Sequence, residues 1–351
     1  MSKKPIKAVE ALQEAQKIAF APFIFQTTVS LRKLGVLNYI FDAKRGVSQN
    51  EICNALSISE YGLSVLLEIA ESAEIVSKDE NENYELTKIG YFLNYNKMTE
   101  VNLNFTQDVC YQGLFHLEDT IRSGKPQGLK EFGDWNTIYE GLSQLPIHVQ
   151  QSWFAFDHFY SDEIFGDALK IIFKNSPKTI FDIGGNTGKF AMLCCEFNQE
   201  VQVKIFDLPG QLQKALANAK EKGLENRISG QEIDWLSDNP QISEGADIIW
   251  MSQFLDCFSK EEILKILSTS VSAMNDETEL IIIETYTDRQ KFGNAKFTLE
   301  ATSLYFTALA NGNSKMYKST ELIELCQKAG LVIDQDIAIG EFHTMFICKK
   351  K

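Results

Sequence analysis

An acidic residue followed closely by glycines is the part of this sequence whose chemistry is easiest to interpret. Asp182 lies in the apolar run 179–183, and Gly184, Gly185 and Gly188 come after it. Glycines at such a turn let the backbone approach a ligand, which a Cβ would prevent. A dinucleotide site needs G-x-G-x-x-G, whereas this turn reads D-x-G-x-x-x-G. The carboxylate repels a pyrophosphate and favours a ligand that carries an ammonium group.

A second acid ends the next alternating segment. Asp207 follows residues 201–206 and lies about 20 residues after the glycine turn, the spacing at which a carboxylate meets ribose hydroxyls. Alone, it would more often be a turn residue before Pro209. Together, the two acids favour S-adenosylmethionine (SAM), which has an ammonium group, a sulfonium and a ribose but no phosphate. Leu208 is included among the predicted cofactor contacts.

The elements that must position these acids are a β-rich segment, the glycine turn and a helix. Residues 190–193 have helix-forming composition directly after the turn. A strand, a glycine turn and a helix form a nucleoside site at the carboxyl edge of an α/β sheet. Two apolar segments near the end of the sequence, 331–333 and 343–348, predict a final antiparallel pair of strands.

The N-terminal region predicts helices with large apolar faces between about Lys7 and Ile40. We expect that one small domain cannot bury all of these groups and that an oligomer interface covers them. The apolar residues concerned are Phe20, Phe23, Phe25, Val29, Leu31, Leu34, Val36, Leu37 and Ile40.

A helix-turn-helix pattern over 47–70, followed by a hairpin that ends at 84–90, predicts a winged helix. Winged helices often bind DNA, so a DNA-binding regulator is a competing interpretation. The second helix of the predicted helix-turn-helix argues against DNA binding. No Lys or Arg occurs between Ser59 and Ser77, and this segment contains four glutamates. Such a helix would repel phosphates.

The composition is that of a globular protein, with 44% hydrophobic and 23% charged residues among 351. A net charge of −14 argues against nucleic-acid partners. No apolar run approaches the roughly 20 residues of a membrane span. The seven cysteines are scattered without a C-x-x-C pair, which predicts reduced thiols, no metal site and a cytoplasmic protein.

The segments FDIGGNTG at 181–188 and FDLPG at 206–210 resemble the class I SAM-dependent O-methyltransferases of the plant caffeate and bacterial hydroxyneurosporene and polyketide group. The resemblance implies a Rossmann-like, seven-stranded α/β sheet behind a mainly α winged-helix domain. It implies dimerisation through residues 1–100, a helical bridge over the substrate at 101–165 and a SAM-binding domain at 166–351. The implied reaction methylates a hydroxyl of a small aromatic or polyketide-like acceptor.

The resemblance also implies roles for residues outside the glycine turn. Asp234 is expected to bind adenine and Trp235 to stack on it, although a core position is nearly as probable for that tryptophan. Ser252 stands where the family has Lys, and Gln253 is expected beside the cofactor. The implied acceptor contacts, three of them aromatic or imidazole side chains, are Phe154, His158, Tyr305 and Asn313.

The catalytic positions depart from the family pattern. Asp256 stands where the family has its basic His, Glu284 matches the acid that orients that base, and Ser314 replaces a second Glu. We hypothesise that Asp256 is the base, with a raised pKa beside Glu284, and that His158 is the reserve candidate. A SAM-binding protein that hydroxylates, decarboxylates or transfers no methyl group remains an alternative.

Overall fold

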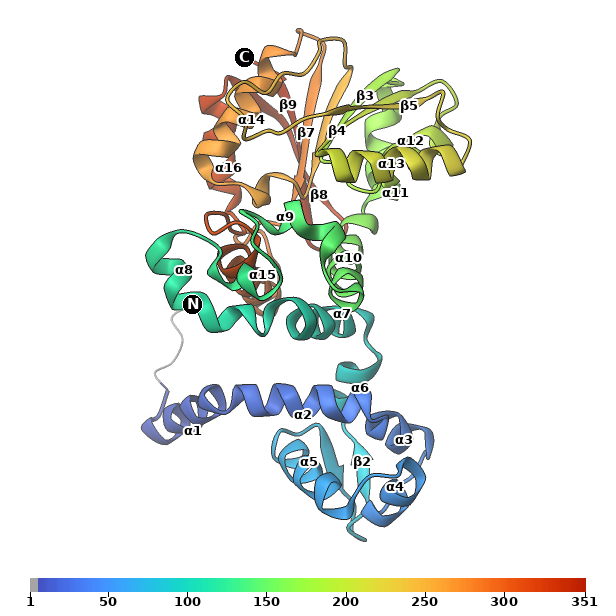
Figure 1. Ribbon diagram of the computed structural model, residues 1–351, viewed down its shortest axis with the longest axis vertical. Coiled ribbons are helices and arrows are strands. Elements are labelled where there is room, and N and C mark those ends of the chain that lie inside the picture. The colour runs from blue at the N-terminus through green and yellow to red at the C-terminus, as the bar shows by residue number, and fades with distance from the viewer. Residues whose placement is uncertain (1–5) are drawn as a thin grey trace. The chain divides into compact units, whose positions relative to one another are not determined.

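The computed structural model describes residues 6–351, which form two compact units that meet in the sequence at Asp108 and Val109 (Figure 1). Each unit has its own core. Within residues 6–351, no helix combines the length and the apolar composition that crossing a membrane requires.

The first unit is a helical domain that contains the predicted winged helix. Strands β1 and β2 pair antiparallel after the helices α4 and α5, which confirms the pattern seen in the sequence. Its elements are α1 (Ala8–Ala19), α2 (Ala21–Lys33), α3 (Val36–Asp42), α4 (Gln49–Leu56), α5 (Glu60–Ser72), β1 (Val76–Lys78), β2 (Tyr84–Leu86), α6 (Lys88–Tyr95) and α7 (Lys97–Phe105).

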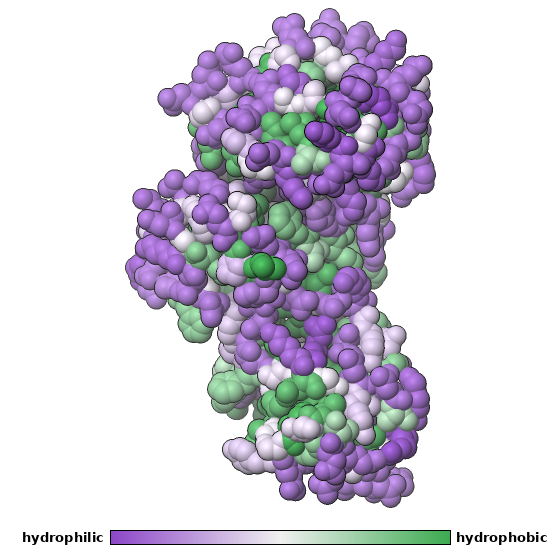
Figure 2. Space-filling model, turned by 45° about the vertical axis from the view of Figure 1, so that its right-hand side comes forward, coloured by the Kyte–Doolittle hydropathy of each residue, from purple (hydrophilic) through white to green (hydrophobic). Residues whose placement is uncertain are grey.

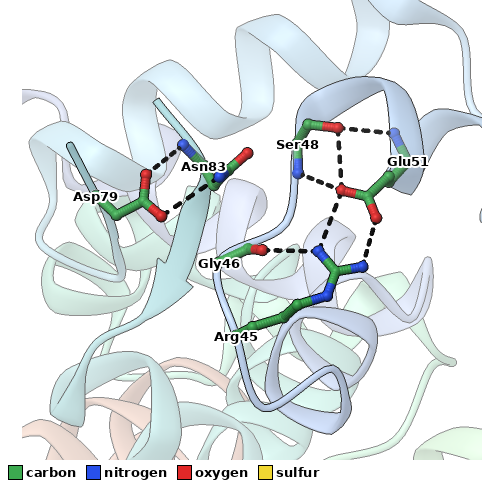
Figure 3. A network of polar contacts seen from close by, with 6 residues as sticks. All are labelled: Arg45, Gly46, Ser48, Glu51, Asp79 and Asn83. Atoms are coloured by element: carbon green, nitrogen blue, oxygen red, sulfur yellow. Dashed lines mark hydrogen bonds and ion pairs between the residues drawn. The ribbon is translucent and has the colours of Figure 1, made fainter. Parts of the chain in front are cut away.

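A polar network fixes the start of α4 in this winged helix (Figure 3). The Ser48 hydroxyl accepts a hydrogen bond from the Glu51 backbone N–H, and the Glu51 carboxylate accepts one from the Ser48 N–H at 2.9 Å. Arg45 pairs with the same carboxylate at 2.6 Å. A Cβ on Gly46 would lie 2.6 Å from a carboxylate oxygen of Asp79, so only glycine lets the wing pass this close.

The apolar residues of the first three helices divide into two groups. Five of them are buried in the core of this unit: Val29, Leu31, Val36, Leu37 and Ile40. They are buried because α2 packs against α3 and α5, and α3 packs in turn against α4, α6 and β2. By contrast, α1 buries no residue, and Phe20, Phe23 and Leu34 are exposed. Figure 2 shows such apolar groups among a mostly hydrophilic surface.

The second unit begins with short helices that precede the sheet. The sequence breaks expected near residues 124 and 146 are present, because Gly124 ends α8 with a positive φ and Pro146 precedes α10. These elements are η2 (Gly113–His116), α8 (Leu117–Ser123), η3 (Gln127–Glu131), α9 (Ile138–Gly141), η4 (Leu142–Gln144), α10 (Ile147–Asp162), α11 (Phe165–Ile172) and η5 (Phe173–Asn175).

A seven-stranded sheet forms the centre of this unit, in the order β5-β4-β3-β6-β7-β9-β8. The first five of these are parallel, while β9 runs antiparallel to both of its neighbours. This confirms the mostly parallel sheet with an antiparallel final pair. The strands are β3 (Thr179–Ile183), β4 (Gln202–Asp207), β5 (Ile228–Glu232), β6 (Ile248–Ser252), β7 (Glu279–Glu284), β8 (Leu331–Ile339) and β9 (His343–Lys350).

Helices cover both faces of the sheet and bury a core against each (Figure 1). One face packs on α11, α12 (Lys189–Phe197) and α13 (Pro209–Glu221), and the other on α14 (Lys260–Ser272) and α16 (Ser319–Lys328). The helix α15 (Gly293–Tyr305) and the π-helical turn η7 (Phe306–Ala310) follow β7. With both faces filled, ligand chemistry is left to the carboxyl edge of the parallel strands.

Candidate active site at the carboxyl edge of the sheet

Four of the predicted polar residues stand at the carboxyl ends of neighbouring parallel strands. Asp182 lies near the end of β3, Asp207 ends β4, Ser252 ends β6 and Glu284 ends β7. The register aligns these ends, with Ile183 opposite both Phe206 and Met251. The structure therefore brings these four residues to one edge.

The glycine turn has the conformation that its sequence requires. Gly184 and Gly188 have φ values of 71° and 77°, in the left-handed region that favours glycine. The Gly184 N–H donates to the carbonyl of Phe206 at 2.9 Å, which ties the turn to β4. At Gly185, a Cβ would come within 2.8 Å of the Asp182 carboxylate. The turn therefore presents bare backbone, and α12 starts directly after it.

Asp207 accepts hydrogen bonds from the backbone on either side of its carboxylate. The N–H of Asn186, in the glycine turn, donates to Oδ2 at 2.8 Å, and the N–H of Leu208 donates to Oδ1 at 2.7 Å. Burial raises the pKa of Asp207 to about 6, against these two bonds. The contacts fix both oxygens at the turn, where the ribose of SAM is expected.

Asp182 is buried, and its Oδ2 has no hydrogen-bond partner among the described residues. Burial, and then the charge of Asp207, raise the pKa of Asp182 to about 8. A buried carboxylate oxygen without a partner is costly unless a ligand satisfies it. This orphaned oxygen beside a bare glycine turn fits a ligand with a cationic group, as SAM is.

Asp234 and Trp235 follow β5, and the first is exposed whereas the second is buried. Asp234 is exposed, and its Oδ1 accepts from the N–H of Leu236 at 2.9 Å. Trp235 is buried in the core between the sheet and α14, with its ring centroid 6.2 Å from that of Phe254, and its Nε1 has no hydrogen-bond partner in the part of the chain that the structure describes. The core position considered for Trp235 is thus the one observed, and adenine binding by these two residues stays a prediction.

Ser252 is the last residue of β6, and Gln253 begins the turn that follows this strand. The Ser252 hydroxyl is buried without a partner among the described residues. Gln253 has a φ of 48°, unusual for a residue with a side chain, and its amide lies 2.6 Å from the ring nitrogen Nε2 of His343. The strained turn directs the next residues back over the end of β7.

Asp256 and Glu284 form a buried pair of acids at this point. One oxygen of Glu284 accepts from the N–H groups of Phe254 and Leu255, at 3.1 and 2.9 Å, while the other has no hydrogen-bond partner within residues 6–351. Asp256, in η6 (Leu255–Cys257), is only 7% exposed. Burial raises the pKa of Asp256 to about 7, and burial with the charge of Asp256 raises the pKa of Glu284. The turn η6 thus folds Asp256 inward, beside Glu284.

Helix α10 supplies a residue that the sequence did not indicate. The Asp157 carboxylate accepts from the amide of Asn186, in the glycine turn, at 2.9 Å. Five residues further on, Asp162 pairs with Lys189, the first residue of α12. In the sequence Asp157 lies among aromatic residues and belongs to no motif, so only its folded position beside the glycine turn identifies it as part of the site.

His158 lies on the same helix as Asp157, but its side chain contacts Asp162. Its Nδ1 is 3.4 Å from Asp162, and this carboxylate raises the pKa of His158. The ring stacks with that of Phe154 at 6.1 Å between centroids. His158 and Lys189 thus both contact Asp162. The charge of His158 also interacts with that of Asp157, which in turn interacts with the charge of Asp256.

The other two predicted acceptor contacts, Tyr305 and Asn313, lie in different surroundings. Tyr305, at the end of α15, is buried, and its hydroxyl accepts from Trp153 Nε1 of α10 at 2.7 Å. Asn313 is exposed, and its amide lies 3.3 Å from Glu262, outside this cluster. Asn311 instead donates to the carbonyl of Cys257. The turn after η7 thus directs Asn311 inward and Asn313 outward, and an acceptor contact by Asn313 stays a prediction.

Tyr139 of α9 and Cys257 complete the polar groups around Asp256. Their side chains hydrogen-bond each other, and burial raises the pKa of both. The two residues are far apart in the sequence, and folding brings α9 and η6 close enough for this contact. Among residues 6–351, no group of His, Cys, Asp and Glu side chains is arranged to hold a metal ion.

The doubly covered sheet, the bare glycine turn and the acids at the ends of β3 and β4 define the class of SAM-dependent methyltransferases. Comparison with known families agrees with this class. The O-methyltransferase domain family matches residues 115–332, and a dimerisation2-like domain matches residues 13–84. The chain belongs to the O-methyltransferase family, whose cofactor is SAM.

Similar proteins and structures cover from two thirds of the chain to nearly all of it. The L-tyrosine C(3)-methyltransferase of Streptomyces lavendulae is 20% identical over 316 residues, which are 89% of this chain and 85% of the relative. Aclacinomycin 10-hydroxylase RdmB of Streptomyces purpurascens is 22% identical over 66% of this chain and 59% of its own. The O-methyltransferase NcsB1 from neocarzinostatin biosynthesis, in complex with SAM and 2-hydroxy-5-methyl naphthoic acid, superimposes with a TM-score of 0.70 at 17% identity, over 93% and 96% of the two chains.

Replacement of Asp207 by alanine is expected to weaken SAM binding by about 1.5–3 kcal/mol, the range for a hydrogen bond to a charged group. The carboxylate lost is the one that the Asn186 and Leu208 N–H groups hold at the turn. Titration calorimetry with SAM and S-adenosylhomocysteine measures the change. Asp167→Ala, on the exposed side of α11, is the control. Unchanged affinity in Asp207→Ala would refute the ribose assignment.

Proposed function

We propose that the protein methylates a hydroxyl of a small, largely apolar aromatic or polyketide-like acceptor, with Asp256 as the base. The observation that supports this most directly is the unpartnered Asp182 oxygen beside the bare glycine turn, with a second buried acid pair at the same edge. The first group suits the cofactor, and the second suits removal of the hydroxyl proton.

SAM, when bound, supplies a methyl group on a sulfonium centre. The residues of this chain then have two tasks, to hold the acceptor oxygen in line with that methyl and to take its proton. Asp256 suits the second task, because a pKa of about 7 makes it a stronger base than an exposed aspartate. Glu284, held by the Phe254 and Leu255 N–H groups, fixes the turn that carries Asp256.

Methyl transfer is tested by incubating the protein with SAM labelled in its methyl group and a panel of phenols and polyketides. Label in an extractable product, dependent on the acceptor, supports the proposal. A protein that binds SAM in calorimetry but labels no acceptor would favour another reaction of the same scaffold, such as hydroxylation or decarboxylation. That alternative draws support from Asp256 in place of the family His and from the similarity to a protein named as a hydroxylase.

A homodimer through the N-terminal unit is the second part of the proposal. Helix α1 buries no residue, and Val9, Leu12 and Ile18 are each more than 60% exposed on it. The dimerisation2-like domain includes this helix from residue 13 onward. Large exposed apolar patches mark interaction surfaces. The acidic face of α5 argues against nucleic acid as the partner, and the seven unpaired thiols support a reducing compartment such as the cytoplasm.

The protein is therefore expected to sediment as a dimer at micromolar concentration. The double variant Leu12→Glu and Ile18→Glu places charges in the proposed interface, and it should shift sedimentation towards the monomer without unfolding, because neither side chain is part of the core. A matched control is Glu14→Gln, on the same helix. A monomeric parent protein would contradict this proposal.

A further inference from the structure

Asn186, in the glycine turn, bonds two acids that lie on different elements of the second unit. Its backbone N–H donates to Oδ2 of Asp207 at 2.8 Å, and its side-chain amide donates to Oδ2 of Asp157 at 2.9 Å. Its φ of 49° lies in the left-handed region, which asparagine tolerates better than most residues with a side chain. The residue that holds the proposed ribose acid therefore also holds helix α10.

Two further contacts hold the same part of α10 at the carboxyl edge of the sheet. Asp162 pairs with Lys189, the first residue of α12, and the carbonyl of Tyr160 accepts from the Gln253 amide at 3.5 Å. The segments that α10 meets follow β3 and β6, which are neighbours in the sheet. Residues 157–162 thus lie beside the carboxyl ends of these two strands, where SAM is expected to bind.

The bond between Asn186 and Asp157 is the strongest of the three contacts on physical grounds. Both side chains are partly buried, and a hydrogen bond to a carboxylate is stronger than one between neutral groups. Lys189 is exposed, so water screens its ion pair with Asp162. The Gln253 contact, at 3.5 Å, is long for a hydrogen bond. The Asn186 amide should therefore contribute most to the position of α10.

We propose that Asn186 is a positioning residue that holds α10 over the cofactor site and so controls how fast SAM enters and S-adenosylhomocysteine leaves. The inference rests on the proposed place of the cofactor at the glycine turn, and it requires neither the acceptor nor the base. The bond joins two groups of the protein, so it stabilises the closed position of α10 with and without bound cofactor. Its loss should therefore raise the rates of entry and release together and leave their ratio nearly constant.

The first test removes the Asn186 amide and follows tritium-labelled S-adenosylhomocysteine. Its release from the full-length protein is timed after addition of excess unlabelled compound, and titration calorimetry gives Kd, so the rate of entry follows from the two. Asn186→Gly keeps the N–H that holds Asp207, and glycine adopts the left-handed conformation without strain. We expect release and entry each to become at least about tenfold faster, in line with a hydrogen bond to a charged group, and Kd to change less than about threefold.

The second test removes the bond from the helix side and leaves the glycine turn unaltered. Asp157→Ala should accelerate release and entry by the same factor as Asn186→Gly. The double variant should be no faster than either single variant, because all three lose the same bond. Asp157→Asn keeps an oxygen that can accept from the Asn186 amide, so its release should stay within about threefold of the parent rate. Asp167→Ala, on the exposed side of α11, is the control and should release at the parent rate.

Release at the parent rate in Asp157→Ala would overturn the inference, and so would equally fast release in Asp157→Asn and Asp157→Ala. A double variant whose acceleration is the product of the two single effects would show that the residues act independently, which also overturns it. Faster release with unchanged entry would mean that the amide contributes to cofactor affinity and not to the position of α10.

The two Asp157 variants decide the question if Asn186→Gly does not fold. Failure of methyl transfer is distinguishable from every one of these outcomes, because release of S-adenosylhomocysteine requires no acceptor and no turnover. A protein that labels no acceptor but shows the expected release rates would keep the role of Asn186 and lose the proposed reaction.

Discussion

Replacement of Gly184 by valine is expected to abolish SAM binding, with affinity reduced more than ~100-fold. Gly184 has a φ of 71°, where a β-branched residue is strained by about 1–3 kcal/mol. A Cβ there would lie 2.4 Å from the Phe254 ring, which packs against Phe258 and cannot easily withdraw. The side chain would also fill the space over the bare turn. Titration calorimetry with S-adenosylhomocysteine measures the loss.

The matched control for this variant is Gly210→Ala in α13, where an added Cβ meets nothing within 4 Å and φ is not positive. It should bind S-adenosylhomocysteine as the parent protein does. Circular dichroism and sedimentation should show the N-terminal unit of Gly184→Val still folded and dimeric. Normal cofactor affinity in Gly184→Val would show that the ligand does not approach this turn.

The second large effect is expected for Asp256→Asn in single-turnover methyl transfer. Loss of a general base typically lowers the rate by 10²–10⁴-fold, and we expect a loss of about 10²-fold or more. Asparagine keeps the size of the side chain and removes only its ability to take a proton. SAM affinity should stay unchanged because Asp256 lies outside the glycine turn.

The pH dependence provides a further sign of the same role. Only ionised Asp256 can accept the proton, and burial raises its pKa to about 7. The single-turnover rate of the parent protein should therefore rise as the pH increases through about 7 and level off above it. In Asp256→Asn that rise should be absent.

His158→Gln separates the two candidate bases. If Asp256 is the base, this variant retains the parent rate, since His158 contacts Asp162 rather than Asp256. A loss of rate in His158→Gln alone would transfer the role to the histidine. Full activity in both Asp256→Asn and His158→Gln would mean that the protein accelerates the reaction only by positioning the acceptor. That result would contradict the assignment of Asp256 as the base.

The cofactor side of the site was predictable because its residues are close in sequence. Asp182, the glycines and Asp207 lie on two successive strands, and parallel pairing alone brings such strand ends together. The winged helix was predictable for a similar reason, since its capping residues and its short hairpin are local signals.

The acceptor side was predicted less well because it is assembled from distant segments. Asp157 lies in a run of aromatic residues, and only the folded path of α10 brings it to Asn186. Tyr139 and Cys257 meet across more than a hundred residues of sequence with no motif to join them. The side chain of Asn311, rather than that of Asn313, points inward to the Cys257 carbonyl. This choice depends on the backbone conformation after η7, which the amino-acid composition does not predict.

The place of β9 within the sheet affects how the protein is made. β9 (His343–Lys350) comes after every other strand in the sequence, yet it lies between β7 and β8 and supplies buried residues to both cores. During synthesis on the ribosome, β7 therefore waits with an unpaired edge, and β8 has no neighbour, until residue 350 has emerged. Exposed strand edges of this kind promote aggregation. The edge of β7 is therefore an aggregation hazard until β9 pairs with it, whereas the N-terminal unit has its own core and can fold before the second unit is complete.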